Sequence, residues 1–174
     1  MDYKVENLLH PYVFEDIKTI TESNINWTCL CNKTVLITGG NGFIAFYLIC
    51  AMLIRNDIYG SNIKIKALVR NRENAENKYG DLLLRDDLEL IVQDVCTPFE
   101  FNRADFVIHA ASQASAYYFE NDPAGTIDAN LTGTANALEY AKKSGSESTL
   151  IVSSLKVYGS VFNGKNSIGE DDIG

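Results

Sequence analysis

The sequence has little basic charge and no long apolar run. Among its 174 residues, 15 lysines and arginines stand against 23 aspartates and glutamates, so the net charge is −8 and the isoelectric point is near 4.7. Such an acidic chain is a poor match for nucleic acids or anionic membranes. The longest wholly apolar run, Phe43–Ile54, has 12 residues, whereas a membrane span takes about 20. We therefore expect neither nucleic acid nor a membrane as partner.

Signals of secretion, metal binding and kinase chemistry are also absent. The N-terminal residues include no apolar stretch followed by a cleavage site, and Cys50 lies inside the apolar run as a small core residue would. Cys29 and Cys31 form a two-ligand pair without a nearby histidine, whereas structural zinc takes four ligands. No G-x-x-x-x-G-K-[ST] motif occurs, which excludes a P-loop kinase. We expect a reduced, cytoplasmic protein without a metal site.

What the sequence does contain is an alternation of short apolar segments and helical segments from residue 33 onward. This alternation is typical of a parallel sheet with helices on both faces. It predicts an α/β fold, a Rossmann-type doubly wound sheet whose ligand crevice lies beyond the carboxyl ends of the strands. The five expected strands are Thr34–Thr38, Ile63–Val69, Leu88–Val92, Asp105–His109 and Thr149–Ser153.

Helix signals fall between these strands. The apolar run is the first helix, and Arg55-Asn56-Asp57 are expected to end it; a second helix lies within Arg70–Asp87. Asp122 and Pro123 suit the N-cap and the first position of a long helix, which Gly145 would terminate. Apolar or small side chains recur every three or four residues along it at Ile127, Leu131, Thr134 and Leu138.

Two regions differ in character. Residues 1–32 are interpreted as an N-terminal extension in which Tyr12–Thr21 forms a short amphipathic helix against the main domain, the alternative being a flexible leader. Residues 33–174 are interpreted as a dinucleotide-binding Rossmann domain. The polar final stretch is an unusual end for such a domain, so we expect a C-terminal catalytic and substrate-binding part that this sequence does not contain.

A glycine-rich segment between the first strand and the first helix is the strongest local motif. It reads as G-x-x-G-x-x-A with Gly39, Gly42 and Ala45, or as G-x-G-x-x-A with Gly40 in place of Gly39. Glycines permit a tight turn and let backbone N–H groups approach a pyrophosphate, while the helix N-terminus adds partial positive charge. The segment predicts a dinucleotide-binding loop, the alternative being a glycine turn without a ligand.

The end of the second strand bears on the choice of dinucleotide. No aspartate or glutamate lies between Gly60 and Arg72 to hold a ribose diol. Arg70, with Arg72 as helper, could instead bind a 2′-phosphate, which favours NADP over NAD. The alternative is that Arg70 stacks on the adenine.

Four motifs in order make the chain resemble an extended short-chain dehydrogenase/reductase of the NAD-dependent epimerase/dehydratase family, whose members modify nucleotide sugars. They are T-G-G-N-G-F-I at 38–44, Q-D-V at 93–95, H-A-A-S at 109–112 and S-S-L-K-V-Y-G at 153–159. The resemblance implies cofactor-binding roles for Gly39, Gly42, Phe43, Ile44, Arg70, Asp94, Val95, Ala110, Ala111, Ser112 and Ser153. It also implies that Asn130 braces the site through backbone hydrogen bonds, whereas His109 is interpreted as structural.

Ser154 is the catalytic residue that the resemblance implies. In the family, this hydroxyl binds the reacting oxygen of the substrate together with a tyrosine of a later Y-x-x-x-K motif, and the lysine lowers the pKa of that tyrosine. No tyrosine of this chain has a lysine four residues later. We therefore expect this chain to be the N-terminal, cofactor-binding portion of an enzyme and to be inactive alone.

The motifs leave the reaction open. Leu155-Lys156 stand where dehydratases and decarboxylases usually have a carboxylate, whereas H-A-A-S-Q-A-S is similar to the decarboxylase pattern. We favour hydride transfer at C4 of a nucleotide sugar, as in an epimerase or ketoreductase. The alternatives are an NADP-dependent carbonyl reductase of the dihydroflavonol-reductase kind and a non-catalytic dinucleotide-binding protein. The resemblance also implies a homodimer through the long helix and, as partners, the nucleotide sugar and the C-terminal part of the enzyme.

Overall fold

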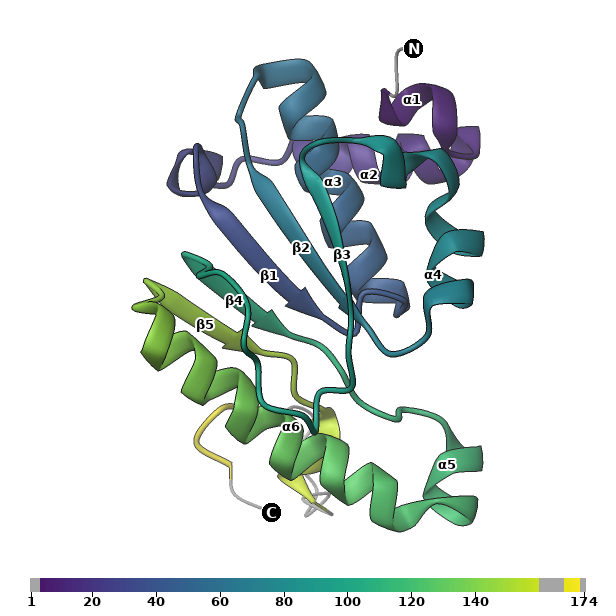
Figure 1. Ribbon diagram of the computed structural model, residues 1–174, viewed down its shortest axis with the longest axis vertical. Coiled ribbons are helices and arrows are strands. Elements are labelled where there is room, and N and C mark those ends of the chain that lie inside the picture. The colour runs from purple at the N-terminus through teal and green to yellow at the C-terminus, as the bar shows by residue number, and fades with distance from the viewer. Residues whose placement is uncertain (1–3, 160–167, 173–174) are drawn as a thin grey trace.

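The computed structural model describes residues 4–159 and 168–172, and these contain a five-stranded parallel sheet. The strand order is β3-β2-β1-β4-β5, the order of a doubly wound Rossmann sheet, as predicted (Figure 1). Each expected strand is present, within two residues of its expected bounds. The strands are β1 (Thr34–Thr38), β2 (Lys64–Val69), β3 (Leu88–Val92), β4 (Phe106–His109) and β5 (Ser148–Ile151).

The sheet buries both faces because its central strands are apolar at successive positions. On one face, Val35 and Ile37 of β1 pack in the cluster that holds α3 (Phe43–Tyr59). On the other, Leu36 of the same strand packs in the cluster that holds α6 (Pro123–Ser144). Figure 1 shows these two helices on opposite sides of the sheet. A strand buried on both faces reads as a continuous apolar run, which is why β1 was recognisable from its residues.

The N-terminal residues form a further layer on the outer side of α3. They comprise α1 (Val5–Leu8), α2 (Pro11–Thr21) and the 3-10 helix η1 (Trp27–Leu30). The predicted helix at Tyr12–Thr21 is confirmed as α2. Val5 and Ile17 are fully buried in the same cluster as α3. This layer explains why α3 is apolar all round: one side faces the sheet and the other faces α1 and α2.

The expected end of the first helix is wrong. The helix α3 continues through Arg55, Asn56 and Asp57 to Tyr59, and Gly60 caps it in the left-handed conformation at φ 62°. The three polar residues stay helical because tertiary partners bind their side chains, and of the three only Arg55 keeps a buried atom, Nε, without a hydrogen-bond partner among the described residues. Arg55 donates to the Thr21 carbonyl and lies 3.7 Å from the centre of the Tyr59 ring.

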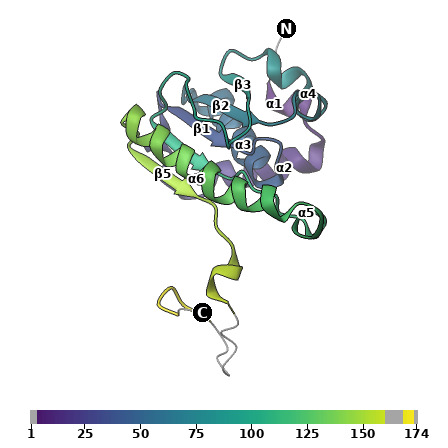
Figure 2. The same ribbon diagram turned by 60° about the horizontal axis from the view of Figure 1, so that its bottom comes forward.

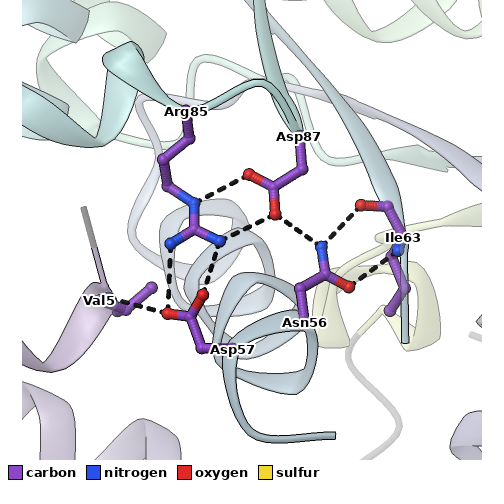
Figure 3. A network of polar contacts seen from close by, with 6 residues as sticks. All are labelled: Val5, Asn56, Asp57, Ile63, Arg85 and Asp87. Atoms are coloured by element: carbon purple, nitrogen blue, oxygen red, sulfur yellow. Dashed lines mark hydrogen bonds and ion pairs between the residues drawn. The ribbon is translucent and has the colours of Figure 1, made fainter. Parts of the chain in front are cut away.

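A polar network at the C-terminal end of α3 joins this helix to the N-terminal layer and to the residues just before β3 (Figure 3). The Arg85 guanidinium binds Asp57 and Asp87 with N–O distances of 2.8 Å, and Asp57 also accepts from the Val5 backbone N–H. Asn56 bridges Asp87 and both backbone groups of Ile63. Desolvation alone would raise the pKa of Asp87, but its hydrogen bonds from Arg85 and Asn56 outweigh that effect and lower the pKa.

The remaining elements are short apart from α6. They are α4 (Arg72–Tyr79), η2 (Gly80–Leu84), α5 (Ala116–Asn121) and η3 (Leu155–Tyr158). The predicted caps of α6 are confirmed: Asp122 accepts from the Gly125 N–H, Pro123 opens the helix and Gly145 ends it at φ 63°. Among the described residues, no helix is both long and apolar enough to cross a membrane.

Candidate dinucleotide site

The glycine-rich loop turns the chain sharply from β1 into α3. Gly39 has φ 70°, and a Cβ there would lie 2.8 Å from the carbonyl oxygen of Ala110, so only glycine fits. The Gly42 N–H donates to the Gly39 carbonyl at 2.7 Å, which closes the turn. A Cβ on Gly42 would lie 3.0 Å from that carbonyl and, chain neighbours aside, would meet no other atom within 4 Å, so a side chain there would crowd the turn on one side and face open space on the other. The loop therefore forms a cradle next to the N-terminus of α3.

A pocket of about 660 Å³ lies beyond the carboxyl ends of the strands. The loop contributes Gly39, Asn41 and Gly42 to its lining. The segments that follow β2, β3 and β4 supply most of the remaining wall, and the first turns of α6 close it. This is the place where an open α/β sheet binds ligands, because the loops diverge there around the reversal of strand order.

The end of β2 brings a cation and two amides to this pocket. Arg70, Asn71 and Asn74 line it, whereas Arg72 pairs with Glu76 at 3.4 Å and is not a lining residue. Arg70 is the one cationic side chain among the described lining residues. Asn71 caps α4 by accepting from the Asn74 N–H at 2.9 Å. The structure thus supplies Arg70, but not its expected helper, to an anionic group.

The segment after β3 holds the expected adenine-side residues in the pocket wall. Asp94 accepts from the Cys96 N–H at 2.8 Å through Oδ1, so it caps a turn while it lines the pocket. Val95 is buried, and its carbonyl accepts from the Asn136 side chain on α6. The segment is therefore fixed against α6.

The wall after β4 is held by three sets of side-chain hydrogen bonds. The Thr38 hydroxyl oxygen accepts from the N–H groups of Ala110 and Ala111 at 3.2 Å each. Ser112 donates to Asn130 at 2.9 Å, a side-chain contact where the resemblance implied backbone contacts. Gln113 is buried and bonds the side chains of Asp122 and Thr126 at 3.3 Å. This wall is consequently tied both to β1 and to the start of α6.

Four expected site residues lie elsewhere. Phe43 and Ile44 are exposed on the first turn of α3 and are not in the pocket lining. Ser153 and Ser154 follow β5, which ends at Ile151 rather than at the expected Ser153. Ser154 accepts from the Lys156 N–H and caps η3. In Figure 2 the chain leaves the sheet after β5 and carries η3 away from the other elements.

Sequence reasoning missed several residues that the fold brings to the site. Asn41, Asn71 and Asn74 line the pocket, and the Asn41 side-chain oxygen is buried without a hydrogen-bond partner in the described part of the chain. Tyr118 of α5 lines it as well. The asparagine spacing at the start of α4 was a usable N-cap signal. Within the described ranges, no group of three or more potential metal ligands comes together.

Comparison with known proteins identifies the family. A profile of the NAD dependent epimerase/dehydratase family matches residues 35–173. The chain therefore belongs to this family, and its fold is the Rossmann-type fold of short-chain dehydrogenases/reductases. Because the family is NAD(P)-dependent, NAD(P) is the expected occupant of the pocket.

Individual relatives agree on nucleotide-sugar enzymes. The chain is 32% identical to UDP-glucuronic acid decarboxylase 6 of Arabidopsis thaliana, over 74% of the chain and 35% of that protein. It is 28% identical to UDP-glucuronic acid decarboxylase 1 of Xenopus tropicalis, over 90% of the chain and 34% of that protein. It thus spans about a third of the length of the curated relatives it matches.

Solved structures share the fold at low identity. The UDP-N-acetylglucosamine 4-epimerase of Methanobrevibacter ruminantium superposes with a TM-score of 0.68 and 20% identity, over 82% of this chain and 44% of that one. The UDP-Glc/GlcNAc 4-epimerase of Campylobacter jejuni superposes with a TM-score of 0.65 and 18% identity, over 80% of this chain and 42% of that one. These likenesses support the fold alone.

Proposed function

We propose that this chain binds NAD(P) as the cofactor portion of an enzyme that transfers a hydride at C4 of a nucleotide sugar. The observation that carries the proposal is the glycine cradle at the head of α3, open at Gly42 toward the pocket and flanked by Arg70. The residues present fit the group. Backbone N–H groups at a helix N-terminus suit a pyrophosphate, and the buried, unpartnered oxygen of Asn41 suits a hydroxyl donor of the ligand.

Titration of the chain with NADP⁺ and NAD⁺, read by calorimetry, tests the proposal through Gly42. In Gly42→Val, the Cβ would crowd the Gly39 carbonyl and the two methyl groups would extend into the open space beside it, so we expect binding to be lost while the domain stays folded. Gly42→Ala adds one methyl group and should weaken binding less. Unchanged affinity in the valine variant would remove the cradle from the site.

We further propose that the cofactor is NADP rather than NAD. Arg70 lines the pocket where a ribose-binding carboxylate would otherwise stand, and a guanidinium matches a phosphate in charge and geometry. Arg70→Asp should invert the preference by repelling the 2′-phosphate. The ratio of the NADP⁺ and NAD⁺ dissociation constants measures this, and an unaltered ratio would mean that Arg70 does not contact that phosphate.

The chemical step is proposed to involve Ser154. Its hydroxyl accepts from the Lys156 N–H and keeps its own proton to donate to a sugar oxygen. The bound dinucleotide would supply or accept the hydride. The tyrosine and lysine of the Y-x-x-x-K motif, which does not occur in this chain, would come from further polypeptide, the proposed C-terminal part of the enzyme.

Two readings compete with this one. The missing Y-x-x-x-K motif favours a non-catalytic dinucleotide-binding protein, and the Arg70 strand end suits an NADP-dependent carbonyl reductase. Cofactor that copurifies and does not exchange would support the C4 epimerase, which reuses it. Freely exchanging NADP would support the reductase. The full reading frame, once read for Y-x-x-x-K, separates both enzymes from the non-catalytic protein.

The setting of this activity is proposed from the cysteines and the surface. All four cysteines are free thiols, which suits the cytoplasm. Ile127, Leu131 and Leu138 are between 46% and 68% exposed on one side of α6, and we propose that this side pairs with a second copy in a homodimer.

A further inference from the structure

The helix α4 stands behind the glycine-rich loop and hydrogen-bonds two of its carbonyl groups. The Lys78 ammonium donates to the Asn41 carbonyl at 2.8 Å. The Tyr79 hydroxyl, which is buried, donates to the Gly40 carbonyl at 2.6 Å. A loop that presents N–H groups to an anion must turn carbonyl groups elsewhere, and those carbonyls need donors. Lys78 and Tyr79 are those donors.

Peptide geometry carries the Tyr79 contact to the opposite side of the loop, whereas the Lys78 contact fixes the next peptide plane, whose Gly42 N–H closes the turn on the Gly39 carbonyl. The described peptide bonds are all trans, so a carbonyl and the N–H that follows it point in opposite directions. With the Gly40 carbonyl held toward Tyr79, the Asn41 N–H must point away from that side chain. Because Asn41 lines the pocket, fixing this peptide plane fixes the direction of a potential anion donor.

The Lys78 charge is itself held in place. Its ammonium lies 5.0 Å from the centre of the Phe46 ring, and that ring lies 5.3 Å from the Tyr79 ring. Partial burial lowers the pKa of Lys78. Lys78 is an exposed residue, and these two contacts hold its ammonium beside the loop. A charge held beside an anion acts on it more strongly than a charge that moves freely in solvent.

The same helix also connects the loop to the end of β2. The Asn41 side-chain amide donates to the Asn71 carbonyl at 3.0 Å, at the N-cap of α4. Asn71 directly follows Arg70. The element that fixes the proposed pyrophosphate cradle is therefore continuous with the segment proposed to bind the ribose phosphate.

We propose that Lys78 is a positioning residue for the cofactor pyrophosphate: it holds the Asn41 carbonyl from behind and places a fixed positive charge under the loop. This inference rests on the proposed dinucleotide site and deepens it. Lys78 does not line the pocket, so it acts through the loop and through its charge. A residue that only packed α4 against the loop would affect every ligand of the pocket alike.

The test compares ligands with and without a pyrophosphate. Dissociation constants of NADP⁺ and of adenosine 2′-monophosphate are measured by calorimetry on the 174-residue chain at low and high salt. Lys78→Met should raise the NADP⁺ constant roughly tenfold and reduce its salt dependence, because a charge and a charge-assisted hydrogen bond are lost. It should leave the adenosine 2′-monophosphate constant within about twofold. Lys78→Arg keeps charge and donor, so it should restore most of the NADP⁺ affinity.

Lys142→Met is the matched control, since it removes the same charge from the exposed last turn of α6. It should leave both constants unchanged. An unchanged NADP⁺ constant in Lys78→Met, or an equal rise for adenosine 2′-monophosphate, would overturn the role of Lys78 and leave the dinucleotide site standing. If the unaltered chain binds neither ligand, the dinucleotide site itself is overturned, and this inference with it.

Discussion

At the residue scale, Thr38 joins the end of β1 to the wall of the pocket. Its oxygen already accepts two N–H groups, from Ala110 and Ala111. Its single proton must therefore be donated to Nδ1 of His109, 2.8 Å away. This bond leaves the His109 ring neutral, with its proton on Nε2. Burial lowers the pKa of His109, which favours the same neutral form.

We expect His109 to make the stability of the fold depend on pH. A histidine in the unfolded chain takes up a proton below about pH 6.5, whereas folded His109 resists until a lower pH. The free energy of unfolding should therefore fall as the pH falls below that value, by up to about 1.4 kcal/mol per pH unit from this group. Urea unfolding of the unaltered chain and of His109→Gln between pH 5 and 7 measures the difference.

His10 provides the matched control, because it lies on the exposed surface before α2. His10→Gln should keep the slope of the unaltered chain, and His109→Gln should flatten it. Equal slopes in all three proteins would contradict the assignment of the slope to His109.

At the element scale, the N-terminal layer and α3 depend on each other. The helix α3 extends five residues beyond the apolar run because tertiary partners bind its polar side chains. No periodicity in the sequence announces this, since the partners Thr21, Arg85 and Val5 are distant along the chain. The bounds of β1, which match the expected Thr34–Thr38, needed no such partners, because the burial of this strand on both faces is evident from its own residues.

We expect removal of the central cation to loosen this junction. Arg85→Met leaves Asp57 and Asp87 as largely buried charges without their counter-ion and should lower the free energy of unfolding by about 3 kcal/mol. Desolvation alone would lower the pKa of Arg85, but the hydrogen bonds and charges of Asp87 and Asp57 outweigh desolvation and raise that pKa. The charged form of Arg85 is therefore stabilised by these two carboxylates. Urea unfolding at pH 7 gives the value.

The control is an exposed pair of the same type. Arg72 pairs with Glu76 at 3.4 Å, and both side chains are more than half exposed. Arg72→Met should cost less than about 1 kcal/mol, because solvent screens such pairs. Similar costs for the two variants would mean that the Arg85 network contributes no more than a surface ion pair.

At the scale of the whole molecule, α6 presents two different faces. Apart from Tyr140, the buried residues of α6 are small, and a Cβ on Gly133 would lie 2.8 Å from Val95 in the segment after β3. The larger apolar residues face outward, and Leu131 is 68% exposed. Periodicity predicted the helix correctly, but it could not say that the helix approaches the sheet through its small residues.

We expect the outward face to control association. In analytical ultracentrifugation, the unaltered chain should sediment as a dimer and Leu131→Glu as a monomer, because two carboxylates would be buried at the interface. Tyr12→Glu, at a residue of α2 that is 75% exposed, should leave the dimer intact. A monomeric unaltered chain, or an unaffected Leu131→Glu dimer, would exclude this face as the contact.

The sequence alone predicted the doubly wound fold class, the glycine-rich loop and the caps of α6, because the alternation of strands and helices, the loop motif and the caps are each visible in residues close together in the chain. It also indicated eight of the residues that line the pocket, which are Gly39, Gly42, Arg70, Asp94, Val95, Ala110, Ala111 and Ser112. Tertiary structure alone decided that Lys78 and Tyr79 support the loop and that Gln113 joins α6. It also placed Ser154 at the start of η3, outside the pocket lining. Such contacts join distant residues whose own types carry no signal of a partner, and only packing brings them together.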